Sequence, residues 1–347
     1  MARKVDLRGT LSTFRTHLKR RGGKNMQLFD LHCDTLFACW ETEQHLRENT
    51  LCVSRDEARK YAMYTQVFAL FCGAKPPVPM PGRRILADLS MEERLDILLA
   101  TAKQEFSANA DWLMLCRDMD DWAWARDHGR HAAFLSIEGA ELLEAPGALD
   151  KAYDAGVRLV TLAWNYQNAF ACGAATDNDK GLTDRGRALV QELVRRNMII
   201  DVSHLSEAGF WDVCLETEAP FAATHSNSRA CCDHKRNLTP LQFSEIVRRG
   251  GLVGLNLYSP FLREDGKSAT IDDVLRHADD LLSRGGEHCL ALGTDFDGCE
   301  DTPEGLRTVG DMENLAEAML RHGYLESTVN ALFYGNAVTF FTRMLGA

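Results

Sequence analysis

Six polar residues of this chain are of the types that bind divalent metals or move protons, and each lies where a short apolar run stops and a turn begins. Imidazole and carboxylate groups hold zinc and similar ions while leaving a coordination position open for water. The pattern therefore predicts a metal-dependent hydrolase. The six residues are His32 and Asp34 in LFDLHCDT, Glu138 in AFLSIEG, His204 in MIIDVSH, His225 in FAATHS and Asp295 in LALGTDFDG.

The spacing and chemistry of five of these residues suit a pair of cations. His32 and Asp34 are two residues apart on one expected strand, so their side chains point to the same side and can reach one ion together. Glu138 has two carboxylate oxygens and can bridge two ions about 3.5 to 4 Å apart. His204 and His225 come from two further strand ends and can supply the remaining ligands.

The expected nucleophile is a hydroxide held between the two cations, because each cation lowers the pKa of the bound water. Asp295 then has a separate role, since it can accept the water's proton during attack and return it to the leaving amine. The chain contains no G-x-S-x-G motif, which agrees with a reaction that uses no side-chain nucleophile.

Short apolar runs alternate with helical patterns along the chain. Ser90 is expected to cap the helix SMEERLDILLATAKQEF, and Thr183 the helix TDRGRALVQELVRRN. Strand then helix, repeated eight times, predicts an α/β fold of the (β/α)8 TIM-barrel type with inserted loops and helices, in which the C-terminal strand ends share one face. LMLC at 113–116 competes as a ninth strand, and AKPPVPMPG at 74–82 is expected as a rim loop. The eight runs lie near residues 28–33, 63–71, 132–137, 157–163, 197–203, 220–225, 251–257 and 289–295.

Length and composition favour one large soluble domain over residues 27–347. The chain has 347 residues, of which 45% are hydrophobic, and no repeat or linker divides it. The formal charge of -11 argues against a nucleic-acid partner, and no apolar run is long enough to predict a transmembrane helix. Eleven cysteines without a C-x-x-C pair are a poor disulfide framework, so the expected location is the reducing cytoplasm.

The first 26 residues form a basic extension that lacks the apolar central block of a secretory signal. Leu7, Leu11, Phe14 and Leu18 follow helical spacing within it. We therefore expect residues 1–26 to form a short amphipathic helix packed on the body, in preference to an organellar targeting signal or a membrane-surface helix.

Each of the six polar residues also has a purely structural explanation, because a strand-end Asp or His often caps a helix or satisfies a loop amide. Ligand-type residues at five separate strand ends of one barrel are hard to explain in that way. Metal binding is therefore the preferred interpretation. The other histidines follow no strand-end pattern and are expected on the surface or in loops: His17, His45, His128, His131, His234, His277, His288 and His322.

The motifs DLHCDTL, SIEGAE, DVSHLS, ATHSNSRA, RNLTP, GTDFDG and GNAVTFF occur in this order from about residue 27 to the end of the chain. Together they resemble the membrane dipeptidase (renal dipeptidase) family of zinc peptidases, within the amidohydrolase-like barrels. The resemblance implies a homodimer with two zinc ions per chain. It assigns one ion to His32 and Asp34, the second to His204 and His225, the bridge to Glu138 and the catalytic acid/base role to Asp295.

The resemblance also assigns substrate-binding residues. It matches Arg236 to the group that binds the substrate's terminal carboxylate, and a guanidinium fork suits that role because it donates two parallel hydrogen bonds. The alternative for Arg236 is a surface cation beside Lys235. Tyr258 in GLNLYS is matched to the substrate pocket, with a packed aromatic as the alternative.

One position departs from the family pattern. Trp164, in TLAWNYQN, stands where mammalian members carry a histidine thought to contact the substrate and stabilise the tetrahedral intermediate. Trp164 offers a single indole donor and a large apolar face, whereas the neighbouring Asn165 can donate a hydrogen bond to an oxyanion. The substrate range of the mammalian enzymes is therefore not transferred to this chain.

These features predict a cytoplasmic metallodipeptidase that hydrolyses the amide bond of small dipeptides, including those with a C-terminal D-residue as relatives do. The nearest alternative is a related amidohydrolase acting on another amide, a lactone or an N-acyl amino acid, because the metal centre sets the reaction while loops set the substrate. A non-catalytic metal-binding barrel is a second alternative. Asp295 argues against it, because a purely structural site does not need that residue.

Overall fold

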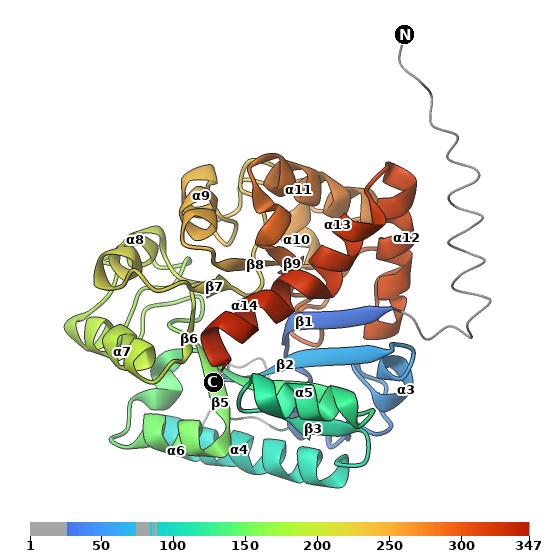
Figure 1. The fold of residues 1–347 in the computed structure, drawn as a ribbon. Coiled ribbons are helices and arrows are strands. Elements are labelled where there is room, and N and C mark those ends of the chain that lie inside the picture. Colours follow the sequence, from blue (N-terminus) through green and yellow to red (C-terminus); the bar gives the residue numbers. More distant parts are fainter. Residues whose placement is uncertain (1–25, 74–83, 85, 87–88, 347) are drawn as a thin grey trace.

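Eight parallel strands close into a barrel in the computed structural model, which describes residues 26–73, 84, 86 and 89–346 (Figure 1). Neighbouring strands pair in the order β2-β1-β9-β8-β7-β6-β5-β4, and the pairing of β2 with β4 closes the ring. The predicted (β/α)8 barrel is confirmed. The strands are β1 (Gln27–Cys33), β2 (Met63–Phe71), β3 (Leu113–Leu115), β4 (His131–Glu138), β5 (Val157–Thr161), β6 (Ile199–Asp201), β7 (Ala222–Ala223), β8 (Leu252–Leu255) and β9 (Leu290–Leu292).

Helices connect the strands and surround the barrel (Figure 1). Both predicted helix starts are confirmed: Ser90 forms a capping box with Glu93, and the Thr183 hydroxyl accepts the backbone N–H of Gly186. The helices are α2 (Thr35–Thr42), α3 (Arg55–Ala58), α4 (Met91–Ala108), α5 (Met119–Asp127), α6 (Ala148–Ala155), α7 (Asp184–Arg195), α8 (Glu207–Glu216), α9 (Pro240–Arg248), α10 (Ser259–Leu262), α11 (Ile271–Ser283), α12 (Met312–His322), α13 (Glu326–Asn330) and α14 (Asn336–Leu345). Shorter helical turns are η1 (Ala140–Leu143), η2 (Gly286–His288), η3 (Val309–Asp311) and the π-helical η4 (Ala331–Gly335).

The ninth strand, β3, is present but lies outside the ring of eight. It pairs with the first residues of β4, from Leu113 with His131 to Leu115 with Ala133, whereas β5 pairs with β4 from Leu135 onward. The segment at 113–116 therefore does contain a strand, but the closed barrel still has eight strands. His131, which was expected on the surface or in a loop, is the first residue of β4.

Several strands end before the predicted apolar runs do, and buried carboxylates explain two of these early ends. Thr224, just after β7, donates its backbone N–H to Asp201 Oδ1 at 2.9 Å. Thr294, just after β9, donates its N–H in the same way to Asp30 Oδ1 at 2.8 Å. In both cases a carboxylate oxygen accepts the backbone N–H in place of a carbonyl oxygen of the neighbouring strand. The strand pairing therefore stops there, and the residues that follow each threonine lie in loops at the barrel mouth.

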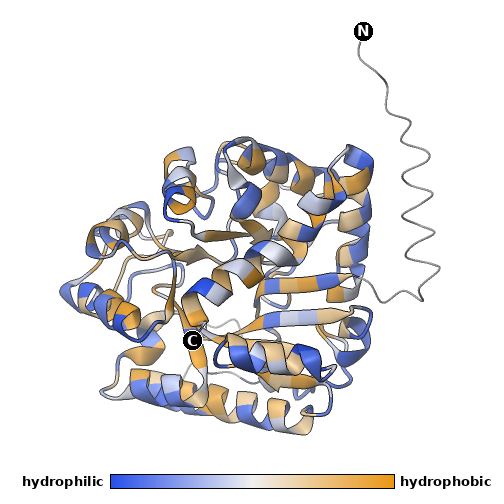
Figure 2. Cartoon of the chain, in the orientation of Figure 1, coloured by the Kyte–Doolittle hydropathy of each residue, from blue (hydrophilic) through white to orange (hydrophobic). Residues whose placement is uncertain are grey.

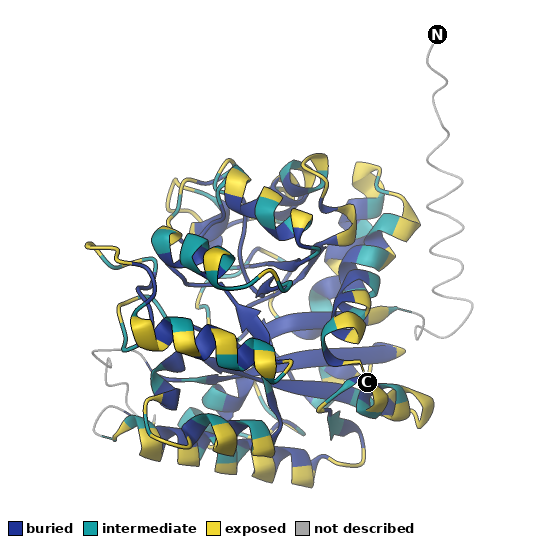
Figure 3. Cartoon of the chain, turned by 60° about the vertical axis from the view of Figure 1, so that its left-hand side comes forward, coloured by how far each residue is buried: buried dark blue, intermediate teal, exposed yellow. Residues whose placement is uncertain are grey.

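Apolar packing fills the N-terminal end of the barrel. The ring of Phe341 on α14 lies 4.7 Å from that of Phe29 on β1 and 5.0 Å from that of Phe134 on β4, measured between ring centres. A second apolar layer lies between the strands and the surrounding helices. The helices accordingly present buried and exposed faces (Figure 3), with apolar and polar residues alternating along them (Figure 2).

His277 corrects another expectation, because it is fully buried on α11. Its Nδ1 accepts the backbone N–H of Ser228 at 3.1 Å, and its Nε2–H donates to the carbonyl of Leu262 at 3.2 Å. Burial is the main cause that lowers the pKa of His277 to about 4, against the opposing bond to Leu262. The nearby charge of Arg276 lowers this pKa further, and that of Asp280 raises it.

Among the described residues, no helix combines the length and apolar character needed to cross a membrane. All eleven cysteines are free thiols. The predicted rim loop at 74–82 and the predicted helix over 1–26, apart from Met26, lie outside the described residues.

Candidate metal centre

The six residues predicted from the sequence gather at the C-terminal mouth of the barrel, and each is at most 8% exposed. They come from segments far apart in the chain, so the fold brings them together. His32 lies on β1, Asp34 precedes α2, Glu138 ends β4, and His204, His225 and Asp295 follow β6, β7 and β9.

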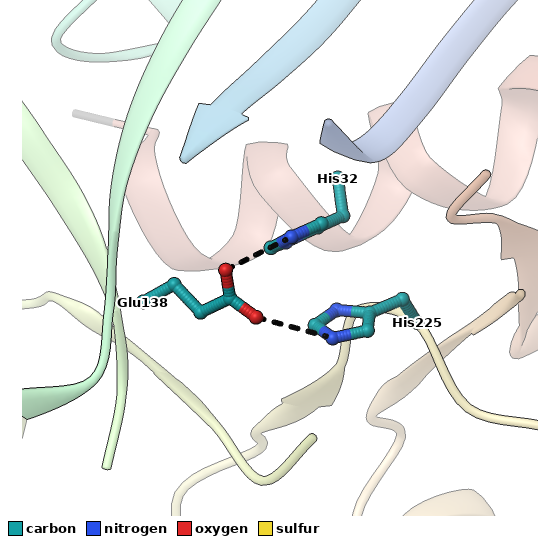
Figure 4. A group of neighbouring side chains, drawn as sticks. All are labelled: His32, Glu138 and His225. Atoms are coloured by element: carbon teal, nitrogen blue, oxygen red, sulfur yellow. Dashed lines mark ion pairs between the residues drawn. The ribbon is translucent and has the colours of Figure 1, made fainter. Parts of the chain in front are cut away.

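Glu138 lies at the centre of the group, with a different set of neighbours at each oxygen (Figure 4). Its Oε2 is 3.6 Å from His32 Nε2, which in turn is 3.4 Å from Asp34 Oδ2. Its Oε1 is 3.0 Å from His204 Nε2 and 3.7 Å from His225 Nε2. One carboxylate therefore separates two clusters of metal-ligand atoms, which is the arrangement that a bridging ligand needs.

Several buried atoms of the site have no hydrogen-bond partner within the described part of the chain. They include His32 Nε2, His225 Nε2 and Asp34 Oδ1. A buried polar atom left without a partner costs about 1 to 3 kcal/mol. Divalent cations would satisfy all three, because imidazole nitrogen and carboxylate oxygen are both zinc ligands. The residues present therefore fit a pair of divalent cations.

The electrostatics of the site agree with this fit. Burial, with neighbouring positive charges adding to it, lowers the pKa of His204 and of His225 well below the ordinary value, and neutral imidazole is the form that binds metal. At His32, burial lowers the pKa, but the nearby carboxylates outweigh it and raise the pKa well above the ordinary value. Burial, reinforced by the charge of Asp34, raises the pKa of Glu138 to about 8. Negative charge is thus crowded where cations would neutralise it.

Two residues of the site have a backbone conformation that side chains rarely adopt. His204 has φ of 66° and Asp295 has φ of 62°, both in the left-handed region. Such a conformation costs a non-glycine residue about 1 to 3 kcal/mol and persists only when the surroundings hold it. Here Ala174 N–H donates to the His204 carbonyl at 2.7 Å, and Asp295 N–H donates to the His32 carbonyl at 3.2 Å.

Asn165 contacts the imidazole of His204. Its Oδ1 lies 2.8 Å from His204 Nδ1, and because a carbonyl oxygen can only accept, Nδ1 carries the proton. The lone pair of His204 Nε2 therefore faces Glu138. The sequence did not indicate this contact, and the predicted role of the Asn165 amide toward an oxyanion stays a prediction. Trp164 is beside the same histidine, with its ring centre 6.0 Å from that of His204.

Arg236 is buried next to the site, at 6% exposure, so the alternative of a surface cation beside Lys235 is wrong. Its Nη2 donates to the His225 carbonyl at 3.4 Å, while its Nε has no partner among the described residues. Burial lowers the pKa of Arg236 to about 10, which leaves the group charged at neutral pH. Tyr258 is half-buried and packs edge-on against Phe261 at 4.9 Å between ring centres.

Two further residues that sequence reasoning missed shape the site. Asn256 Nδ2 donates to Asp295 Oδ2 at 2.8 Å, and Asn256 Oδ1 accepts the backbone N–H of Tyr258 at 2.6 Å. The other oxygen, Asp295 Oδ1, lies 3.8 Å from His32 Nε2. A Cβ at Gly298 would collide with the carboxylates of the site. The only sequence signal for either residue was its place beside a predicted site residue.

Residues 20–344 match the profile of a family described as Membrane dipeptidase (Peptidase family M19). A Klebsiella pneumoniae protein, described as an uncharacterized protein in the pqqA 5' region, is 36% identical over 255 residues, which are 70% of this chain and 94% of that protein.

Two solved structures resemble the chain over almost its full length. One is a metallopeptidase described as dipeptidase AC, with a TM-score of 0.80 and 31% identity over 93% of this chain and 100% of that chain. The other is a Rhodobacter sphaeroides metallopeptidase bound to a phosphinate mimic of the dipeptide L-Ala-D-Ala, with a TM-score of 0.79 and 29% identity over 92% and 100%. With a family match that spans nearly all of its residues, this chain belongs to the membrane dipeptidase family.

Proposed function

We propose that this metal-dependent dipeptidase works with two zinc ions that share Glu138. The observation that carries the proposal is the environment of that carboxylate: Oε2 faces His32 and Oε1 faces His204. In this proposal His32 and Asp34 hold one ion, and His204 and His225 hold the other. When bound, such ions lower the pKa of a water and polarise the scissile carbonyl.

Asp295 moves the proton in the proposed mechanism. Its Oδ2 is engaged by Asn256, so Oδ1 is the oxygen that is available to the substrate. It accepts the proton of the attacking water and then delivers it to the nitrogen of the leaving amine as the amide C–N bond breaks. This role gives Asp295 a function that metal binding alone does not require.

Arg236 binds the terminal carboxylate of the dipeptide in this proposal. Its buried charge supports that role, as does its Nε, which has no partner among the residues that the structure describes, because a desolvated guanidinium gains most from a bidentate anion. Tyr258, Trp164 and Asn165 are proposed to line the substrate pocket. A C-terminal D-residue is proposed as acceptable because the Rhodobacter sphaeroides relative binds a mimic of L-Ala-D-Ala.

Metal analysis combined with a substrate screen tests the proposal. The purified chain is dialysed against a chelator, reconstituted with Zn²⁺, Mn²⁺ or Co²⁺, and assayed with L,L- and L,D-dipeptides and with N-acyl amino acids. We expect chelation to abolish dipeptide turnover and Zn²⁺ to restore it. Turnover that survives complete metal removal would contradict the metal centre, and turnover of N-acyl amino acids alone would favour the amidohydrolase alternative.

We extend the proposal to a cytoplasmic homodimer. The eleven free thiols support a reducing compartment. The dimer follows from the family resemblance, and light scattering of the purified chain tests it: a mass near 77.6 kDa, twice the 38.8 kDa of one chain, is expected.

A further inference from the structure

The imidazole of His225 is fully buried and has a neighbour at each nitrogen. On one side, Nε2 lies 3.7 Å from Glu138 Oε1. On the other side, Nδ1 lies 2.9 Å from the hydroxyl oxygen of Thr224. The position of the ring proton therefore depends on what the Thr224 hydroxyl can offer.

Asp201 fixes the direction of the Thr224 hydroxyl. Its Oδ2 accepts from Thr224 Oγ1 at 2.6 Å and from Thr161 Oγ1 at 2.7 Å, and its Oδ1 accepts the backbone N–H groups of Thr224 at 2.9 Å and Ser203 at 3.0 Å. With four donors directed at its two oxygens, Asp201 acts only as an acceptor. The single proton of the Thr224 hydroxyl therefore points to Asp201.

A hydroxyl that has given its proton to Asp201 can only accept from its other neighbours, which are His225 Nδ1 at 2.9 Å and the Ser203 hydroxyl at 3.5 Å. His225 Nδ1 must then carry the ring proton and donate it to Thr224. That tautomer leaves the lone pair on Nε2, the nitrogen that faces Glu138 and that has no other partner in the described part of the chain.

We infer that Thr224, backed by Asp201, is a positioning residue that sets the tautomer and ring orientation of His225 for a cation. The inference rests on the proposed function, since it concerns one of the two proposed ions. Partners of this kind typically change metal affinity by about 10- to 100-fold when removed. Thr224 acts on His225 as Asn165 acts on His204, so both histidines on the Oε1 side of Glu138 have a fixed proton.

The chain offers a matched control for testing this inference. Thr161 is as buried as Thr224 and donates its hydroxyl to the same Asp201 oxygen, but it is not bonded to His225. Thr224→Val and Thr161→Val thus each remove one donor from Asp201, and only the first removes the acceptor from His225 Nδ1. Thr224→Ser keeps the hydroxyl and serves as the conservative variant.

The measurement is Zn²⁺ affinity of the full chain by competition with a fluorescent chelator, with folding checked by circular dichroism. We expect Thr224→Val to bind one of the two Zn²⁺ equivalents about 10- to 100-fold more weakly, and Thr161→Val and Thr224→Ser to bind both as wild type does. Unchanged affinity in Thr224→Val, or an equal loss in Thr161→Val, would overturn the inference. A wild-type chain that binds no Zn²⁺ would instead overturn the proposed function, and the inference with it.

A second measurement does not need any Thr224 variant to fold. Long-range ¹H–¹⁵N spectra of the metal-free wild type, with ¹⁵N-labelled histidine, report the tautomer of each ring, and His225→Gln identifies the His225 signals. We expect a protonated Nδ1 and an unprotonated Nε2 at His225. A proton on Nε2 would overturn the inference.

Discussion

Gly298 offers a direct steric test of the site, because it lies against two of its carboxylates. A Cβ at this position would stand 2.0 Å from Asp34 Oδ2 and 2.7 Å from Asp295 Oδ1, whereas ordinary contacts begin at 3.4 Å. In Gly298→Ala the Asp34 oxygen must therefore retreat by about 1.4 Å. A misplacement of about 1 Å at a reacting centre costs about 100-fold in rate, so we expect kcat/KM to fall by about two orders of magnitude.

The control for Gly298→Ala is Gly335→Ala, because Gly335 has a φ of -63° that any residue can adopt. A Cβ at Gly335 would have its nearest neighbour, the Asn330 carbonyl oxygen, at 3.7 Å, which is an ordinary contact. We expect Gly335→Ala to keep the wild-type kcat/KM for an L,D-dipeptide and the wild-type zinc content. Both quantities are measured in parallel for Gly298→Ala. Wild-type activity in Gly298→Ala would refute the geometry of Asp34 and Asp295 described above.

Three further predictions follow from single side chains. Asp295→Asn should keep both cations and lower kcat about 100-fold or more. Metal analysis of the variant checks the first part: if it retains one cation fewer than the wild type, Asp295 is a metal ligand instead. Arg236→Lys should lower kcat/KM for a dipeptide with a free C-terminal carboxylate roughly 30-fold, which corresponds to about 2 kcal/mol of transition-state stabilisation. The same dipeptide with an amidated C-terminus should be affected much less. Equal losses on both substrates would contradict carboxylate binding. His277 binds its proton at about pH 4 in the folded chain but near its ordinary value of 6.5 when unfolded, so stability should fall by about 3 kcal/mol as pH drops through this window. Urea unfolding at several pH values measures how steeply the free energy of unfolding depends on pH. We expect a shallower pH dependence for His277→Gln than for the wild type. An unchanged pH dependence would count against a buried neutral imidazole at His277.

The clustering of the six site residues could be predicted from sequence because a parallel barrel brings all C-terminal strand ends to one face. The long runs that became β1, β2 and β4 were also placed almost at their observed bounds. These strands pair along most of their length, so the apolar pattern and the hydrogen-bonded ladder coincide. His32 and Glu138 were therefore correctly placed at strand ends.

The features that could not be predicted from sequence depend on contacts between residues that are distant in the chain. β9 ends early because Asp30, 264 residues away, accepts the N–H of Thr294. The burial of Arg236 and of His277 likewise follows from tertiary packing, which a local basic or polar pattern does not report. The sequence predicts Asn165 as a substrate contact, whereas its bond to His204, 39 residues away, has no local signal.

Anomalous diffraction from crystals of the zinc-loaded chain is the most direct test of whether two cations share Glu138. We expect two anomalous peaks at the zinc edge, one on each side of the Glu138 carboxylate, the first against His32 and Asp34 and the second against His204 and His225. Peaks away from Glu138, or only one peak at full zinc loading, would show that Glu138 does not bridge two cations.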